Sequence, residues 1–88
     1  LLDEPEAALS PQRQLTFLKI IHDLVEDGEC QFIITTHSPI LLGYPEATIY
    51  SFDDGIIQEV NYEDTDHYRL TKYFLEHRER FLKELLDD

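Results

Sequence analysis

The run Cys-Gln-Phe-Ile-Ile-Thr-Thr-His at positions 30–37 constrains the fold of this 88-residue chain more than any other stretch. It is short, apolar and rich in β-branched residues, which is typical of a strand covered on both faces. Strands of this kind occur mainly in parallel sheets, where the connection between neighbouring strands is usually a helix. The run therefore predicts a parallel strand that follows a crossover helix.

A helix of the right kind is predicted immediately before this strand. Ser10 is a preferred capping residue, and Pro11 suits the first helical position because its missing N–H would be unpaired there anyway. Gly28 is a typical residue just past a helix end. With Leu1-Leu2 as the tail of a buried strand, the pattern predicts a strand–helix–strand unit with a right-handed crossover. The apolar residues recur at three-and-four spacing and predict a broad buried face: Leu15, Phe17, Leu18, Ile20, Ile21, Leu24 and Val25.

The second half of the chain has a different pattern. A Ser-Pro cap predicts one helical turn over residues 38–43. Residues 47–52 and 56–60 flank Asp53-Asp54-Gly55 and predict a β-hairpin with Asp-Gly turn chemistry. From about residue 64 the pattern is helical, with Leu70, Tyr73 and Phe74 and then Phe81, Leu82, Leu85 and Leu86 as the apolar positions, and with a break expected between His77 and Arg80.

The predicted fold class is therefore α/β: a parallel strand–helix–strand unit and a β-hairpin, followed by C-terminal helices. The predicted domain boundary separates residues 1–62 from a helical extension over residues 63–88.

The charge of the chain limits its partners. The net charge of −12 repels phosphate backbones, so we expect no direct contact with nucleic acid, whereas a basic protein is a fitting partner. No apolar run approaches the roughly 18 residues of a membrane span. The single cysteine, Cys30, cannot form an internal disulfide, which fits a cytoplasmic setting, and we expect it to be a small buried side chain.

Three chemically useful side chains fall at the carboxyl ends of the two predicted strands, where ligands of parallel sheets bind. Asp3 can hold Mg²⁺, which favours oxygen ligands and usually accompanies nucleotide phosphates. Glu4 can orient or deprotonate a water that attacks a terminal phosphate, and His37 can reach the same phosphate with an imidazole N–H. An Asp-Glu pair alone is more often a solvated loop or a helix cap, and a single histidine is more often structural.

The two motifs together resemble a known family. The sequence LLDEPEAALSP, followed by FIITTHSP, looks like the C-terminal part of an ATP-binding-cassette-type ATPase, closest to the soluble, non-transporter branch. The resemblance implies a partial P-loop NTPase sheet, with residues 1–62 as the C-terminal part of the nucleotide-binding domain. It implies that Asp3 ends the Walker B strand and serves Mg²⁺, that Glu4 is the catalytic base, and that His37 is the switch histidine.

The resemblance also implies a dimer contact. The residues Ala7, Ala8, Leu9 and Ser10 resemble the D-loop, which in this family crosses a dimer interface beside the nucleotide of the other subunit. Ser10 stands where the D-loop commonly has aspartate.

The phosphate-binding loop of the family has no counterpart here. None of the three glycines is followed by Lys-Ser or Lys-Thr, and the chain contains no methionine. We therefore expect a fragment of a longer ATPase, which contributes to binding and hydrolysis of Mg-ATP in the parent protein but is inactive in isolation.

Two other functions remain open at this point. The first is a non-catalytic, acidic protein-interaction module, in which Asp3-Glu4 only caps the following helix. The second is a small metal-dependent phosphohydrolase, which would need more ligands around Asp3 than the chain offers. For an isolated fragment, open sheet edges and uncovered apolar faces predict self-association.

Overall fold

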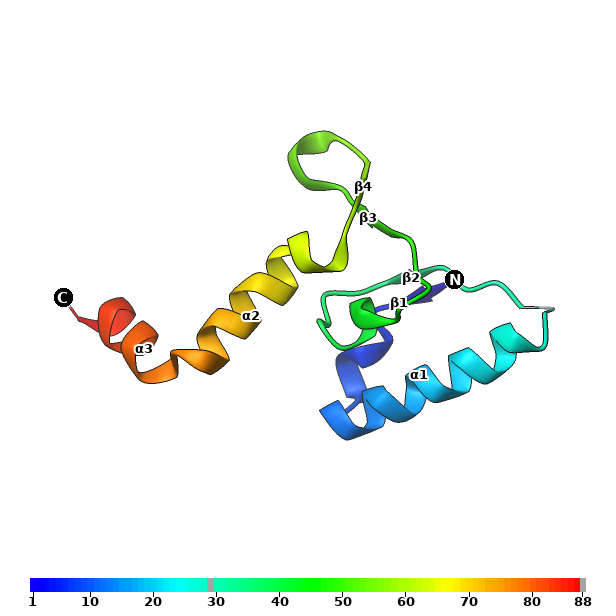
Figure 1. Cartoon of the computed structure of the whole chain (residues 1–88), viewed down its shortest axis with the longest axis horizontal. Coiled ribbons are helices and arrows are strands. Elements are labelled where there is room, and N and C mark those ends of the chain that lie inside the picture. The colour runs from blue at the N-terminus through cyan, green and yellow to red at the C-terminus, as the bar shows by residue number, and fades with distance from the viewer. Residues whose placement is uncertain (29, 88) are drawn as a thin grey trace. The chain divides into compact units, whose positions relative to one another are not determined.

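The computed structural model describes residues 1–28 and 30–87 (Figure 1). Over these residues it has an α/β fold with a short parallel strand pair, an antiparallel hairpin and three α-helices, which confirms the predicted fold class and is consistent with part of a P-loop NTPase sheet. The chain divides into two compact units, Leu1–Ala47 and Thr48–Asp88. The domain boundary predicted after residue 62 stays a prediction.

The first unit contains the predicted strand–helix–strand arrangement. Strand β1 (Leu2–Asp3) pairs in parallel with β2 (Ile34–Thr35). The backbone amide of Glu4 donates to the carbonyl of Thr35 at 2.7 Å, so the hydrogen bonding between the two segments continues to the residue that follows β1. The carboxyl ends of β1 and β2 therefore lie next to each other.

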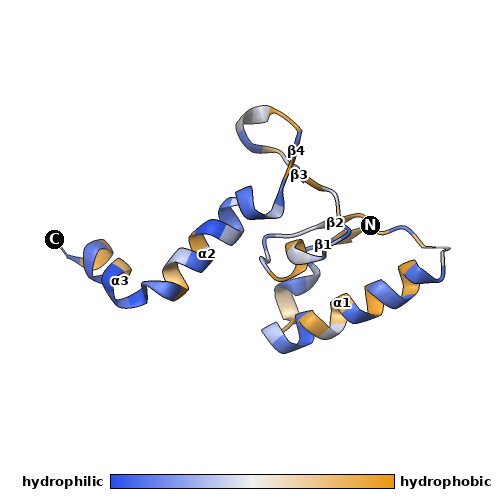
Figure 2. Ribbon diagram, in the orientation of Figure 1, coloured by the Kyte–Doolittle hydropathy of each residue, from blue (hydrophilic) through white to orange (hydrophobic). Residues whose placement is uncertain are grey.

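Helix α1 (Pro11–Glu26) connects these strands, and its boundaries follow the predicted capping signals. The Ser10 side chain accepts a hydrogen bond from the backbone amide of Arg13 at 3.2 Å. Gly28 has a φ of 79°, a left-handed conformation that glycine adopts without steric cost. Figure 2 shows apolar residues recurring along α1 between hydrophilic ones.

The core of the first unit is small. Ile21 on α1 is 7% exposed and Leu41 is 6% exposed, and α1 contacts the short 3₁₀ turn η2 (Leu41–Gly43) that contains Leu41. The ring nitrogen Nδ1 of His22 lies 3.0 Å from the hydroxyl of Tyr44. Tyr44 directly follows η2, so this contact also attaches the end of the turn to α1. The predicted turn over residues 38–43 is confirmed, as 3₁₀ geometry.

Two predictions about burial in this unit are wrong. The buried face of α1 is narrower than the periodicity indicated, because Leu15, Ile20 and Leu24 are all exposed. Strand β2 covers only part of the predicted run, with Ile33 61% exposed and Cys30 exposed rather than buried. The physical reason is that, among the described residues, β2 pairs with β1 alone. The paired part of β2 therefore cannot be longer than the short strand β1.

The second unit begins with the predicted hairpin. Strand β3 (Ile49–Ser51) pairs with β4 (Gln58–Val60) in antiparallel register, with Ser51 opposite Gln58. Residues 52–57 connect the strands through the 3₁₀ turn η3 (Asp53–Gly55), where Gly55 has a φ of 71°. The predicted glycine turn is confirmed, although both strands are shorter than predicted.

Two helices end the chain. A 3₁₀ turn, η4 (Tyr62–Asp64), leads into α2 (Asp66–Glu76), and α3 (Arg78–Leu86) follows. His77 separates them with non-helical angles of −131° and 36°, within the predicted break. None of the helices in residues 1–28 and 30–87 is long and apolar enough to cross a membrane.

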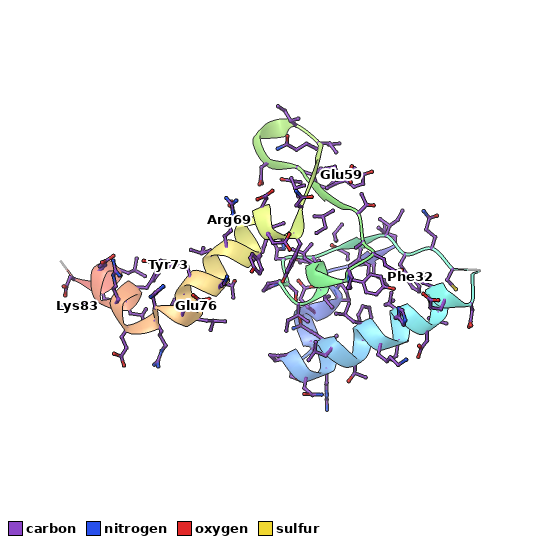
Figure 3. All side chains as sticks on the ribbon, in the orientation of Figure 1. Phe32, Glu59, Arg69, Tyr73, Glu76 and Lys83 are labelled. Carbon is purple, nitrogen blue, oxygen red and sulfur yellow. The ribbon has the colours of Figure 1, made fainter. Side chains whose placement is uncertain are left out.

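Aromatic side chains hold the two terminal helices together. The ring of Phe81 on α3 lies edge-on to Phe74, 5.6 Å between centroids, and to Tyr73, at 5.8 Å. Figure 3 shows the side chains of Arg69, Tyr73 and Glu76 along α2. The Arg69 guanidinium binds the Asp64 carboxylate at 2.8 Å and so attaches α2 to η4.

Candidate functional site

The parallel register places Asp3 opposite Thr35 at the ends of β1 and β2. The Thr35 hydroxyl donates to Oδ1 of Asp3 at 2.5 Å. Both residues are exposed, so this bond holds the carboxylate at the rim of the sheet while leaving it open to solvent. The exposed carboxylate of Asp3 can therefore still be offered to a cation, and Mg²⁺ prefers such carboxylate oxygens.

The chain turns sharply at Glu4. Its φ of 46° and ψ of 56° are left-handed, and Glu4 is the residue other than glycine that has a positive φ within the described part of the chain. Such a conformation costs about 1–3 kcal/mol in a residue with a side chain and is often found at functional sites. The turn leads directly into the 3₁₀ helix η1 (Pro5–Ala8).

The side chain of Glu4 meets that of His37. Oε1 of Glu4 lies 2.7 Å from Nδ1 of His37, and the two side chains are 51% and 74% exposed. The geometric expectation from the sequence is therefore met, because the acid at the end of β1 and the imidazole beyond the end of β2 face one solvent-open space. Their roles in chemistry remain predictions.

Glu6 holds the backbone of the same loop. Its Oε2 accepts a hydrogen bond from the amide of His37 at 3.1 Å. Burial is the largest influence on the pKa of Glu6 and raises it. Hydrogen bonds from the Thr36 side chain and from the amides of Glu6 and His37, together with the charge of His37, outweigh burial and hold this pKa below its usual value. Glu6 is therefore favoured in its charged form beside His37.

A group of potential metal ligands forms around this contact. Ligand atoms of Glu4, Glu6 and His37 all lie within 4.8 Å of one another. In addition, Oε1 of Glu6 is buried and has no hydrogen-bond partner among the described residues. Asp3, the predicted magnesium ligand, is not part of this group, whose mixture of imidazole and carboxylate differs from the oxygen set that Mg²⁺ prefers.

The predicted D-loop residues lie between the candidate site and α1. Ala7 and Ala8 end the 3₁₀ helix η1, Leu9 is extended, and Ser10 caps α1. Ala7, Ala8 and Ser10 are exposed, whereas Leu9 is half-buried. The segment is thus accessible next to Glu6, and its predicted contact across a dimer interface stays a prediction.

Four residues that sequence reasoning did not assign to the site support it: Thr35, Glu6, Gln14 and Ser38. Thr35 is opposite Asp3 in the observed register, whereas the sequence predicted parallel pairing without a register. The other three act through hydrogen bonds that depend on tertiary structure, for which the sequence carries no periodic signal. Gln14 and Ser38 are bonded to each other through their side chains.

Part of the chain is similar to a known protein family. Residues 1–42 match the family described as an AAA ATPase domain, and the matched stretch includes Asp3, Glu4 and His37. The match supports an ATPase family in general. The narrower assignment to the ATP-binding-cassette type and to its Walker B segment stays a prediction.

A curated relative is also similar to part of the chain. Over 40 residues, or 46% of its length, the chain is 40% identical to the OLD nuclease of Thermus scotoductus. The chain spans only 8% of the length of that relative. No solved structure matches the chain.

Proposed function

We propose that residues 1–42 carry the hydrolytic side of an ATP-hydrolysing site of the ATP-binding-cassette type. The observation that carries the proposal is the contact between Glu4 and His37 beyond the ends of two paired parallel strands, with Asp3 beside them. The similarity of the same residues to an AAA ATPase domain supports it. In this proposal Asp3 ends the Walker B strand and is a ligand of Mg²⁺.

Each side chain then has a distinct task. Asp3 would hold Mg²⁺ through its carboxylate, and the ion would supply stabilisation of the charge that develops on the phosphate oxygens. Glu4 accepts the proton of the attacking water, and the exposed position of its carboxylate leaves room for that water. Asp3 keeps its orientation through the Thr35 hydroxyl.

The Glu4–His37 contact makes a specific demand on the imidazole. A neutral ring that donates from Nδ1 to Glu4 has a lone pair on Nε2, which would repel a phosphate oxygen. An imidazolium donates from both nitrogens, so it can bind Glu4 and a terminal phosphate together. The proposal therefore uses His37 in its charged form when the phosphate is bound.

In this proposal the phosphate-binding loop is supplied by polypeptide other than these 88 residues, in which no glycine is followed by Lys-Ser or Lys-Thr. The small share of the OLD nuclease that the chain spans is consistent with a longer protein. The exposed segment from Ala7 to Ser10 would then face a second subunit, as a D-loop does, so the proposal includes self-association.

This proposal is tested by titration calorimetry with Mg-ATP. The complete gene product that contains this chain is expected to bind Mg-ATP and hydrolyse it, whereas the 88-residue chain alone is expected to show no micromolar binding. The physical reason is that the carboxylates and imidazole of this chain do not supply the backbone N–H cradle that grips the phosphates. Micromolar binding of Mg-ATP by the isolated 88-residue chain would contradict the proposal that other polypeptide supplies the phosphate-binding loop.

The acidic interaction module remains the second candidate, because specific surface features favour it. Residues 48–88 lie outside the family match, and α2 and α3 expose Leu70, Leu75, Leu85 and Leu86 in a chain of net charge −12. A complete gene product that neither binds nor hydrolyses ATP, but binds a basic protein, would favour this function.

A further inference from the structure

A glutamine on α1 links the two segments that the candidate site depends on. The side-chain amide nitrogen of Gln14 donates to the carbonyl of Leu9 at 3.2 Å. Its side-chain oxygen accepts a short hydrogen bond from the hydroxyl of Ser38. Leu9 belongs to the segment after β1, and Ser38 directly follows His37 after β2, so a single side chain bridges both.

Ser38 is well placed to transmit this link. It is 7% exposed, and its hydroxyl oxygen accepts from the amides of Ile40 at 3.1 Å and Leu41 at 3.2 Å. A hydroxyl has one hydrogen to donate and two lone pairs, so the bond to Gln14 completes its hydrogen bonding. The Ser38 side chain therefore has one satisfied orientation, which fixes the backbone at the residue next to His37.

The other side of His37 is fixed as well, by Glu6. The His37 amide donates to the Glu6 carboxylate, and Glu6 lies in the same segment after β1 as Leu9. The backbone of the histidine is thus held on one side by Glu6 and on the other by Ser38, which Gln14 of α1 links to the carbonyl of Leu9. Motion of that segment has to move His37 unless one of these bonds breaks.

The chemistry requires a primary amide at position 14. A side-chain amide is the neutral group that both donates and accepts through adjacent atoms at the end of a flexible stem. A carboxylate would place a second acceptor against the Leu9 carbonyl, and a leucine would leave the hydrogen of the buried Ser38 hydroxyl without an acceptor. An unpaired buried hydroxyl costs about 1–3 kcal/mol, so the Ser38 side chain would rotate or the loop would shift.

We propose that Gln14 is a positioning residue that couples the Ala7–Ser10 segment to the switch histidine His37. The proposal rests on the function proposed above, in which His37 contacts phosphate and Ala7–Ser10 faces a second subunit. When a second subunit binds the Ala7–Ser10 segment, this coupling changes the position of the His37 imidazole. Dimer formation is thereby linked to hydrolysis.

The test uses the complete gene product and a matched pair of variants on one helix. Gln14→Leu removes both hydrogen bonds at nearly constant volume, whereas Gln12→Leu makes the same change at an exposed position of α1. Gln14→Leu is expected to lower kcat about 10- to 100-fold through misplacement of His37, with the Kd for Mg-ATP unchanged within about twofold. Gln12→Leu is expected to keep both values.

A double-mutant cycle separates coupling from general damage to the fold. Ser38→Ala removes the partner hydroxyl, and Ser38→Thr retains it. We expect Ser38→Ala and Gln14→Leu to be non-additive in kcat, because each breaks the same link, and Ser38→Thr to restore most of the activity. Fully additive losses, or equal losses in Gln12→Leu, would overturn the proposal.

A second readout does not depend on ATP hydrolysis. In protein labelled with ¹⁵N-histidine, the imidazole signals of His37 are expected to shift in Gln14→Leu and Ser38→Ala but not in Gln12→Leu. Unmoved His37 signals in both site variants would refute the coupling even in an active enzyme. Shifted signals in a gene product without ATPase activity would instead refute the proposed function and leave the link itself standing.

Discussion

Replacing Glu4 by glutamine in the complete gene product is expected to lower ATP turnover by about 10²–10⁴-fold, the usual contribution of a general base. Glutamine has nearly the same shape but cannot accept the proton of the attacking water. The Glu4 side chain projects beyond the end of β1 and is half exposed, so the change does not disturb a buried group. Binding of Mg-ATP is expected to persist, because Asp3 and the phosphate loop are unchanged.

Steady-state hydrolysis and nucleotide binding measured on the same preparations check this expectation. Glu46→Gln is the matched control, since Glu46 is an exposed glutamate of the same unit that lies outside the candidate site. The control variant should hydrolyse ATP at the unaltered rate. Retained turnover in Glu4→Gln would reject Glu4 as the base, and loss of binding would show that its carboxylate serves the metal or the fold instead.

Truncating Ile21 to alanine is expected to destabilise the first unit by about 2–5 kcal/mol, the usual cost of a buried large-to-small substitution. Ile21 and Leu41 are the apolar side chains that are buried among the described residues, so a cavity at Ile21 removes much of a small core. Most small domains are only about 5–15 kcal/mol stable. The site is built on the same unit, so the loss also reaches Glu4 and His37.

The neighbouring isoleucine provides the control. Ile20 is 53% exposed on the same helix, and Ile20→Ala is expected to change the unfolding free energy by less than about 1 kcal/mol. Urea titrations followed by the amide NMR signals of α1 compare the two variants directly. Equal effects of the two substitutions would contradict the burial pattern and the position of the core.

Local signals in the sequence were sufficient to predict most of the elements. The caps of α1 at Ser10 and Gly28 depend on hydrogen bonds and φ angles of a few adjacent residues, and both were predicted correctly. The glycine of the hairpin turn, Gly55, follows the same logic. These features need no knowledge of distant parts of the chain.

Burial was harder to predict, because periodicity shows which residues share a face but not how much of that face is covered. The apolar stripe of α1 includes Ile21, which is buried, and Ile20 and Leu24, which are exposed. The run before His37 looks like a central strand, yet only Ile34–Thr35 is paired. Both outcomes depend on the neighbours available for packing, which the local pattern does not specify.

In the candidate site, too, some features could be predicted from the sequence and others could not. Asp3, Glu4 and His37 could be brought together from the topology of parallel strands alone, because the carboxyl ends of such strands share one edge of the sheet. The supporting bonds of Glu6 and Gln14 could not, since each joins side chains to a loop more than twenty positions away. Their detection requires the tertiary arrangement.

A crystal structure of the complete gene product with Mg²⁺ and a non-hydrolysable ATP analogue tests the central claim most directly. We expect a carboxylate oxygen of Asp3 to lie about 2.0–2.1 Å from Mg²⁺ or one water away from it. Glu4 and His37 are expected on the same side of the terminal phosphate, with Glu4 next to the attacking water. A nucleotide bound with Asp3, Glu4 and His37 all outside its contact shell would contradict the account.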